Sequence, residues 1–336
     1  MANARDARAW AHAALRGIGD SLYTPFSGVD GEDIDWEAYR ILVRHCVTDL
    51  GHPMLWCTSG VAEFWSLTID ERKRLLEIAI EEGRAANPDL VVQACTAATS
   101  PKDCVELTLH AQTVGADIAY IQTPMMEAHG GEGVLRFFRY VADRTDIALG
   151  MFNSPSSGYV LTAAESAEIY AEIPAVCATK EGAFRAQNSR RLHELAPELV
   201  IWECDLTVYR AGWLRAGIVC PAQLGTVGYL HETPQHRILT PYWDLVYNDK
   251  LSEAIDYART SGMDQFDLDM GSVFVCYPGR ADYFTHWGGA FKHAAALLGL
   301  PIGDYPHSRA PQAELPTVAK DQIEAAYRRL GLLENP

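Results

Sequence analysis

The sequence predicts a (β/α)8 TIM barrel followed by a C-terminal helical extension. Eight short apolar segments alternate with amphipathic helical segments between about residues 17 and 228, as eight strand–helix units require. The apolar segments are continuous and end at turn residues, which is typical of parallel strands buried on both faces. No Gly-x-Gly-x-x-Gly pattern follows the first segment. A doubly wound dinucleotide-binding sheet is therefore disfavoured.

The predicted strands are followed by helices with recognisable start signals. The strands cover residues 19–26, 53–60, 90–97, 118–124, 147–155, 175–182, 199–205 and 217–225. TIDE at 68–71 and TAAE at 162–165 match the capping box, in which a hydroxyl and a glutamate satisfy backbone amides at the helix start. SPKD at 100–103 places proline at the first helical position.

The chain ends differ in composition from the barrel. Residues 1–228 are predicted to form the barrel and residues 229–336 the helical extension, with helices near 235–262, 284–299 and 318–332. The first seventeen residues, MANARDARAWAHAALRG, lack the apolar centre of a secretory signal and predict a short surface helix. No run of 18 apolar residues occurs, so no transmembrane helix is expected.

Composition narrows the function classes. A formal net charge of −16 argues against nucleic acid as a partner and gives no support for binding to an anionic membrane. The eight cysteines form no Cys-x-x-Cys pair, which favours reduced core residues of a cytoplasmic protein. The histidines show no His-x-His or His-Glu-x-x-His pattern, so no metal site is expected.

Lys180 is the candidate catalytic residue. Barrel enzymes place their active sites at the carboxyl ends of the strands, and Lys180 is the one lysine of six that ends an apolar strand. Burial lowers the pKa of an amine, and a neutral amine can attack a carbonyl to form an imine. The alternative is an ion pair with Glu181 or another carboxylate at the rim. The other lysines are predicted to be solvated surface charges: Lys73, Lys102, Lys250, Lys292 and Lys320.

Six segments resemble, in order and spacing, the dihydrodipicolinate synthase and N-acetylneuraminate lyase family. They are LYTPF (22–26), TSGVAEFWSLTIDER (58–72), GADIAYIQTP (115–124), FNSPSSG (152–158), ATKEG (178–182) and RAGIVCPAQLG (215–225). The resemblance implies a class I aldolase-type barrel in which Lys180 forms a Schiff base with pyruvate or another 2-oxo acid. It further implies a covalent imine without a separate cofactor, and a homo-oligomer, either a tetramer or a dimer.

The resemblance also implies residues that bind the substrate. Thr58, Ser59 and Gly60 match the loop in which a hydroxyl and backbone N–H groups bind the carboxylate of the 2-oxo acid, although an ordinary turn would have the same composition. Gly225 ends the segment that matches the wall of the pyruvate pocket.

Departures from the family pattern affect proton transfer. The family usually has a tyrosine where this chain has Phe152, and a phenyl ring can neither donate nor accept a proton. Glu203 follows an apolar strand end and is the predicted replacement acid–base group, with a rim ion pair as the alternative. Tyr23 and Tyr120 are further candidates if their side chains point inward, although a tyrosine at such a position is more often a core or wall residue.

Further departures concern substrate choice. Met125 and Met126 replace a tyrosine pair, and Ser157 stands at the position of the arginine that binds substrate in the lysine-biosynthetic synthase. That activity is therefore disfavoured. A pocket with Phe152, Met125 and Trp56 would suit an apolar substrate arm, as in hydratase-aldolases of aromatic ylidenepyruvates. The alternatives are imine-dependent dehydration, deamination or decarboxylation of a sugar-acid or amino-acid derivative, or a barrel that only binds a 2-oxo acid.

Overall fold

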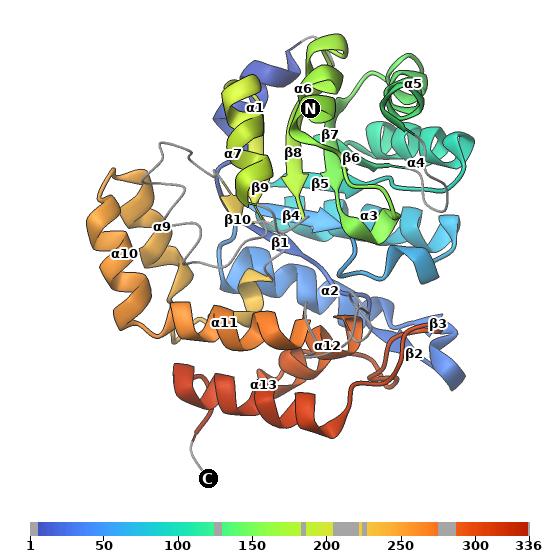
Figure 1. Cartoon of the computed structure of the whole chain (residues 1–336). Helices are drawn as coiled ribbons and strands as arrows, with labels where there is room; N and C mark the ends of the chain where they lie inside the picture. The colour runs from blue at the N-terminus through green and yellow to red at the C-terminus, as the bar shows by residue number, and fades with distance from the viewer. Residues whose placement is uncertain are drawn as a thin grey trace.

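The protein is an eight-stranded parallel barrel with helices around it (Figure 1). The computed structural model describes residues 6–123, 130–182, 186–203, 222–223, 227–274 and 287–334. The strands are β1 (Gly17–Ser21), β4 (Met54–Cys57), β5 (Val91–Cys95), β6 (Ile118–Gln122), β7 (Ala148–Asn153), β8 (Val176–Glu181), β9 (Val200–Glu203) and β10 (Ala222–Gln223). Their order is β10-β1-β4-β5-β6-β7-β8-β9 with parallel pairing throughout. The two ends of this order, β9 and β10, also lie next to each other, so the strands surround a common interior. Each predicted strand overlaps an observed one, and the predicted fold class is confirmed.

Helices alternate with the strands, and the three that follow residues 68, 100 and 162 begin where the sequence signals place them. They are α2 (Trp36–Arg44), α3 (Ile69–Ala86), α4 (Pro101–Val114), α5 (Gly130–Ala142), α6 (Ala163–Glu172) and α7 (Ala186–Leu195). Both predicted capping boxes are present: the Thr68 and Thr162 hydroxyls each accept an N–H from the glutamate three residues later, and that glutamate accepts from the capping residue. These reciprocal bonds satisfy amides that the first helical turn leaves unpaired.

Aromatic side chains fill the inside of the barrel. Trp56 packs edge-on against Tyr120 and Phe152, with ring centroids 5.7 and 5.1 Å away, and Tyr120 also contacts Trp202 at 5.7 Å. Gly150 makes room for this packing, because a Cβ at that position would come within 2.4 Å of the Tyr120 ring. The barrel interior is thus a packed aromatic core on which the carboxyl-end side chains rest.

The N-terminal helix α1 (Ala7–Ala14) is less exposed than the sequence predicts. Ala7 and Ala11 are fully buried, and Arg8 donates to the backbone oxygens of Val176 and Tyr170. The prediction of a surface helix is therefore wrong for the face that packs on β8. Alanine-rich sequence hid this packing, since small side chains leave no strong apolar stripe.

In its described residues, the C-terminal extension contains five helices that lie together on one side of the barrel (Figure 1). They are α9 (Leu239–Tyr247), α10 (Leu251–Thr260), α11 (Met263–Phe274), α12 (Trp287–Leu297) and α13 (Thr317–Leu330). The helical segment predicted near 235–262 forms the two helices α9 and α10, which are separated at Asp249, where φ is 59°. No helix in the described ranges is long and apolar enough to cross a membrane.

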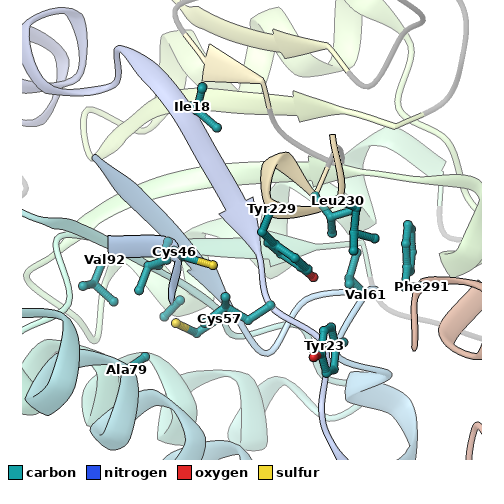
Figure 2. Close-up of a cluster of buried hydrophobic side chains, with 14 of the residues drawn as sticks. Ile18, Tyr23, Cys46, Cys57, Val61, Ala79, Val92, Tyr229, Leu230 and Phe291 are labelled. Carbon is teal, nitrogen blue, oxygen red and sulfur yellow. The ribbon is translucent and has the colours of Figure 1, made fainter. Parts of the chain in front are cut away.

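Several short elements lie between the longer strands and helices. They are the hairpin β2 (Phe26–Ser27) and β3 (Asp33–Ile34), the π-helical turn η2 (His45–Asp49), and the 3-10 turns η1 (Val29–Gly31), η3 (Phe64–Ser66), η4 (Pro155–Ser157) and η5 (Gly228–Leu230). Figure 2 shows part of one buried cluster that includes Val61, Leu230 and Phe291 of α12. Barrel and extension therefore share a continuous apolar core.

A buried ionic network adds a second connection between them. The His52 ring contacts Asp20 Oδ2 of β1 through Nδ1 (2.6 Å) and Glu232 Oε1 through Nε2 (2.9 Å). The Glu232 carboxylate also accepts the first backbone N–H groups of α9, from Ile238, Leu239 and Thr240. A carboxylate is favourable at a helix N-terminus, where these amides have no helical partner.

Candidate active site

Lys180 is the next-to-last residue of β8 and lies at the carboxyl end of the barrel. Its side chain is 6% exposed, and Nζ lies 4.6 Å from the Phe152 ring centroid and 5.5 Å from that of Trp56. Phe152 is its register partner on β7. Gly182 leaves space for the amine, because a Cβ there would come within 2.7 Å of Nζ. The amine is thus directed into a largely apolar site.

Glu181 is not the ion-pair partner that the alternative interpretation of Lys180 requires. Its carboxylate accepts from Asn153 Nδ2 at 3.1 Å and from Asn188 Nδ2 at 3.2 Å, with Thr179 Oγ1 at 3.3 Å. Burial raises the pKa of Glu181, and these hydrogen bonds, together with a smaller effect of the Lys180 charge, offset part of that increase. Among the described residues, no carboxylate forms an ion pair with Lys180. This arrangement favours the reactive amine.

The loop after β4, Thr58 to Glu63, has the features of an anion site. We call it the carboxylate loop. Thr58 has a φ of 53° and donates from Oγ1 to Cys95 O at 3.0 Å. Ser59 is fully buried, yet its hydroxyl has no hydrogen-bond partner among the described residues. The N–H groups of Ser59, Gly60 and Val61 donate to no backbone carbonyl of the described chain. A buried hydroxyl beside free amides is suited to a carboxylate.

The carboxylate loop lies across the barrel from Lys180. In the order of the eight strands, β8 is the fourth strand after β4, so β4 and β8 stand on opposite walls of the barrel. The Trp56 ring of β4 nevertheless lies within 5.5 Å of Lys180 Nζ. A small 2-oxo acid with its carbonyl at the amine and its carboxylate at the loop would span this interior.

The other predicted site residues differ in where the structure places them. Phe152 faces the barrel interior beside Lys180. Glu203 ends β9 opposite Glu181 in register, and its side chain lies outside the described part of the chain. Met125 and Gly225 also lie outside the described residues.

The two tyrosine candidates point in different directions. Tyr120 lies inside the barrel between the Trp56 and Trp202 rings. Tyr23 instead packs in the outer core, where its hydroxyl donates to Pro301 O at 2.8 Å. Tyr23 is therefore a structural residue that connects β1 to the C-terminal extension. Burial raises its pKa well above the ordinary value.

The sequence did not predict that Arg72 would lie near the site. Arg72 of α3 is buried, and its guanidinium donates to Ala97 O at 2.7 Å and to Cys95 O at 2.8 Å. Burial raises the pKa of the Cys95 thiol, while the charges of Arg72 and Lys180 lower it. Arg72 is the last residue of the TIDER segment, but nothing in that pattern shows that its side chain turns inward. It supports the strand end beside the carboxylate loop.

Lys292 corrects a prediction. The sequence places it on a helix as a solvated charge, but it is 0% exposed and forms an ion pair with Glu63 at 2.9 Å, also 0% exposed. Burial raises the pKa of Glu63 and lowers that of Lys292, and the attraction between them opposes both shifts. The prediction failed because the partner is 229 residues away in sequence.

Within the described ranges, no three histidine, cysteine, aspartate or glutamate side chains are grouped so that they could bind a metal ion. The five described cysteines, Cys46, Cys57, Cys95, Cys104 and Cys177, are buried and free. Burial raises the pKa of Cys57, Cys104 and Cys177 to about 12, so these thiols stay protonated and pack as small apolar groups.

Known proteins share both sequence and fold with this chain. A 4-hydroxy-tetrahydrodipicolinate synthase of Nitrobacter hamburgensis is 27% identical over 187 residues, which are 55% of this chain and 61% of that protein. The chain thus spans about three fifths of that curated relative. The structure of the synthase from Cyanidioschyzon merolae with lysine bound has a TM-score of 0.78 at 20% identity, covering 95% of this chain and 99% of the other. YagE from E. coli K12, in complex with pyruvate, gives 0.77 at 20%, covering 95% and 99%.

The sequence match is broader than any one of the six segments that carried the resemblance. A model of the dihydrodipicolinate synthetase family matches residues 14–217, which are more than half of the chain. This region includes the carboxylate loop, Phe152 and Lys180. The resemblance inferred from the sequence is confirmed: the chain belongs to the dihydrodipicolinate synthetase family.

Proposed function

We propose that the protein is a lyase or aldolase that binds a pyruvate-type 2-oxo acid as an imine on Lys180. The observation that carries the proposal is the buried amine, which lies over Phe152 and Trp56 without an ion-pair partner among the described residues. Family membership supports the same chemistry, and the related YagE has pyruvate bound. No separate cofactor is part of this mechanism, because the protonated imine itself accepts the electron pair.

The proposed reaction balances around the lysine. The neutral amine adds to the C2 carbonyl, and loss of water gives the imine. The substrate carries a hydroxyl on C4, and a ylidenepyruvate gains this hydroxyl when water adds across the C3–C4 double bond of the imine. Transfer of the hydroxyl proton to the acid–base group breaks the C3–C4 bond, whose electron pair moves into the protonated imine as the aldehyde leaves. Protonation of the resulting enamine and hydrolysis release pyruvate and restore the amine. Aldol addition is the reverse sequence.

Two parts of the site would serve this reaction without covalent chemistry. The Ser59 hydroxyl and the free amides of the carboxylate loop would hold the substrate carboxylate. Phe152 would pack beside the imine but move no proton. Glu203, which ends β9 at the same rim, is our proposed acid–base group. A homo-oligomer, tetramer or dimer, is also part of the proposal.

We further propose aromatic ylidenepyruvates as substrates, as in the hydratase-aldolases. The Phe152 and Trp56 rings near the amine support an apolar substrate arm, and Trp65 lies beside the loop, 3.8 Å from where a Gly60 Cβ would stand. Benzylidenepyruvates should therefore yield pyruvate and an aromatic aldehyde in a coupled pyruvate assay. Pyruvate release from sugar acids but from no aromatic compound would contradict this substrate class.

Phe152 supports a second candidate, a barrel that binds a 2-oxo acid without turning it over. Loss of the family tyrosine removes its proton relay. Two measurements distinguish a lyase from a protein that only binds the 2-oxo acid. A binding-only protein would show pyruvate-dependent stabilisation against heat without pyruvate release from any substrate, whereas the lyase shows both.

Ser59→Ala is expected to weaken pyruvate binding without weakening the fold. A hydrogen bond to a charged group contributes about 1.5–3 kcal/mol, so the pyruvate concentration for half-maximal imine formation should rise about tenfold or more. Stability should be unchanged, since the hydroxyl has no partner to lose within the part of the chain that the structure describes. Borohydride trapping across a pyruvate titration measures the first effect and denaturant unfolding the second.

The matched control is Ser166→Ala. Ser166 of α6 is equally buried and its hydroxyl is equally unpartnered, but it lies outside the site. Equal pyruvate titrations for wild type and Ser59→Ala would show that the carboxylate does not bind at this hydroxyl.

A further inference from the structure

The carboxylate loop ends in a backbone conformation that needs support. Glu63 has φ 59° and ψ 43°, in the left-handed region that residues with a side chain rarely adopt. Such a conformation costs on the order of 1 kcal/mol and persists only where surrounding contacts determine it. The contacts that determine it at Glu63 come from the C-terminal extension.

Three groups of the extension enclose the Glu63 carboxylate. Lys292 Nζ of α12 donates to Oε1 at 2.9 Å, and the backbone N–H of Arg309 donates to Oε2 at 3.1 Å. Gly288 of α12 permits this approach, because a Cβ there would lie 2.2 Å from Oε1. The carboxylate is therefore inserted between α12 and the segment before α13.

Lys292 is itself fixed in place. Its ammonium also donates to His307 O at 2.8 Å and lies 3.9 Å from the Phe26 ring centroid. The Arg309 side chain packs on the same ring at 4.3 Å and forms an ion pair with Glu71 of α3 at 2.8 Å. The two groups that donate to the Glu63 carboxylate are therefore held in place by contacts of their own.

Backbone hydrogen bonds carry this constraint into the anion site. The Glu63 N–H donates to Gly60 O at 3.0 Å, and the Ala62 and Phe64 N–H groups donate to Ser59 O at 3.1 and 3.3 Å. Thr24 Oγ1 donates to Ala62 O at 2.9 Å. Since these bonds fix the carbonyls of Ser59 and Gly60, they also fix the directions of the amides that follow. Val61, between them, belongs to the shared core with Phe291 (Figure 2).

We propose that Lys292 and Glu63 are positioning residues through which the C-terminal extension sets the geometry of the carboxylate loop. This inference rests on the proposed function, because it assigns the loop to the substrate carboxylate. Loosening the pair reduces affinity for the 2-oxo acid and leaves the Lys180 amine able to form an imine once the acid is bound. A misplacement of about 1 Å in such a site can cost about a hundredfold.

The test compares pyruvate titrations of imine trapping in the wild-type protein and four variants. Glu63→Gln and Lys292→Met each break the pair. Lys292→Met combined with Glu63→Gln removes both charges, which avoids the penalty of one unpaired buried charge. Glu232→Gln is the control: it alters an equally buried carboxylate that also joins barrel to extension, but at His52.

We expect all three pair variants to need at least about ten times more pyruvate for half-maximal trapping, with the maximal yield near wild type. Glu232→Gln should lower stability and leave the pyruvate titration unchanged. A folded double variant with the wild-type titration, or an equal shift in Glu232→Gln, would overturn the inference. Absence of trapping in wild type would instead refute the proposed function.

Discussion

Lys180→Ala is expected to abolish imine trapping and to lower pyruvate release by at least about a thousandfold. The amine is the nucleophile of the proposed mechanism, and a methyl group offers neither the covalent intermediate nor its electron sink. The fold should survive, because Lys180 forms no ion pair among the described residues whose loss would leave a charge unpaired. Borohydride trapping and the coupled pyruvate assay measure the two losses.

Two control variants distinguish loss of the nucleophilic amine from loss of the positive charge. Lys180→Arg keeps a cation near the Phe152 and Trp56 rings but offers no neutral amine at neutral pH, and it should be as inactive as Lys180→Ala. Lys250→Ala changes a half-exposed lysine of the extension and should retain full activity. A Lys180→Ala protein with more than about a tenth of wild-type activity would exclude the imine mechanism.

His52→Leu is expected to lower the free energy of unfolding by about 3–5 kcal/mol, because it leaves two buried carboxylates without their shared partner. Burial alone would lower the pKa of His52, but Asp20 and Glu232 outweigh it and raise the pKa from 6.5 to about 9. Burial opposes ionisation of Glu232 as well, yet His52 lowers its pKa to about 2. Denaturant midpoints of wild type and variant measure the loss.

The same network predicts a pH dependence of stability. The His52 contribution is complete below about pH 6.5, its ordinary pKa, and is lost as the pH rises through about 9. The Glu232 contribution is complete above about pH 4.5 and is lost as the pH falls toward about 2. His52→Leu should remove most of the decline between pH 6.5 and 9. His12→Leu, at an exposed histidine, should leave the decline in place. If both variants keep it, the network is not its source.

The strands and helix starts were predictable because their determinants are local. Apolar runs between turn residues located the eight strands, and the hydroxyl–glutamate spacing at Thr68 and Thr162 located two helix starts. The helix break at Asp249 was not predictable, since lysine and aspartate there are compatible with a solvated helix surface. Local sequence does not show where a left-handed residue will be tolerated.

The residues predicted for the site are clearer from the sequence than the groups that hold them in place. Lys180 stood out because a cation at the end of an apolar strand has few structural uses, and the structure places it over two aromatic rings. The partners that decide its surroundings come from distant segments. Glu63 and Lys292 look like surface charges within their own helices and turns, and their burial follows only from the packing of α12 onto the barrel.

The orientation of the tyrosines shows the same limit. Tyr23 and Tyr120 both occupy predicted strands, yet one hydroxyl bonds Pro301 outside the barrel and the other ring lies within it. Tyr23 stands two residues beyond the last residue of β1, where strict alternation of side chains no longer applies. The replacement of the family tyrosine by Phe152, by contrast, could be read from the sequence. The structure places the Phe152 ring beside the Lys180 amine.

Reductive trapping of the wild-type protein tests the central claim most directly. The protein is incubated with pyruvate, reduced with borohydride and digested, and the peptides are weighed by mass spectrometry. We expect one reduced pyruvate adduct, on Lys180 in the segment AVCATKEG at 175–182. No adduct, or an adduct confined to another lysine, would contradict it.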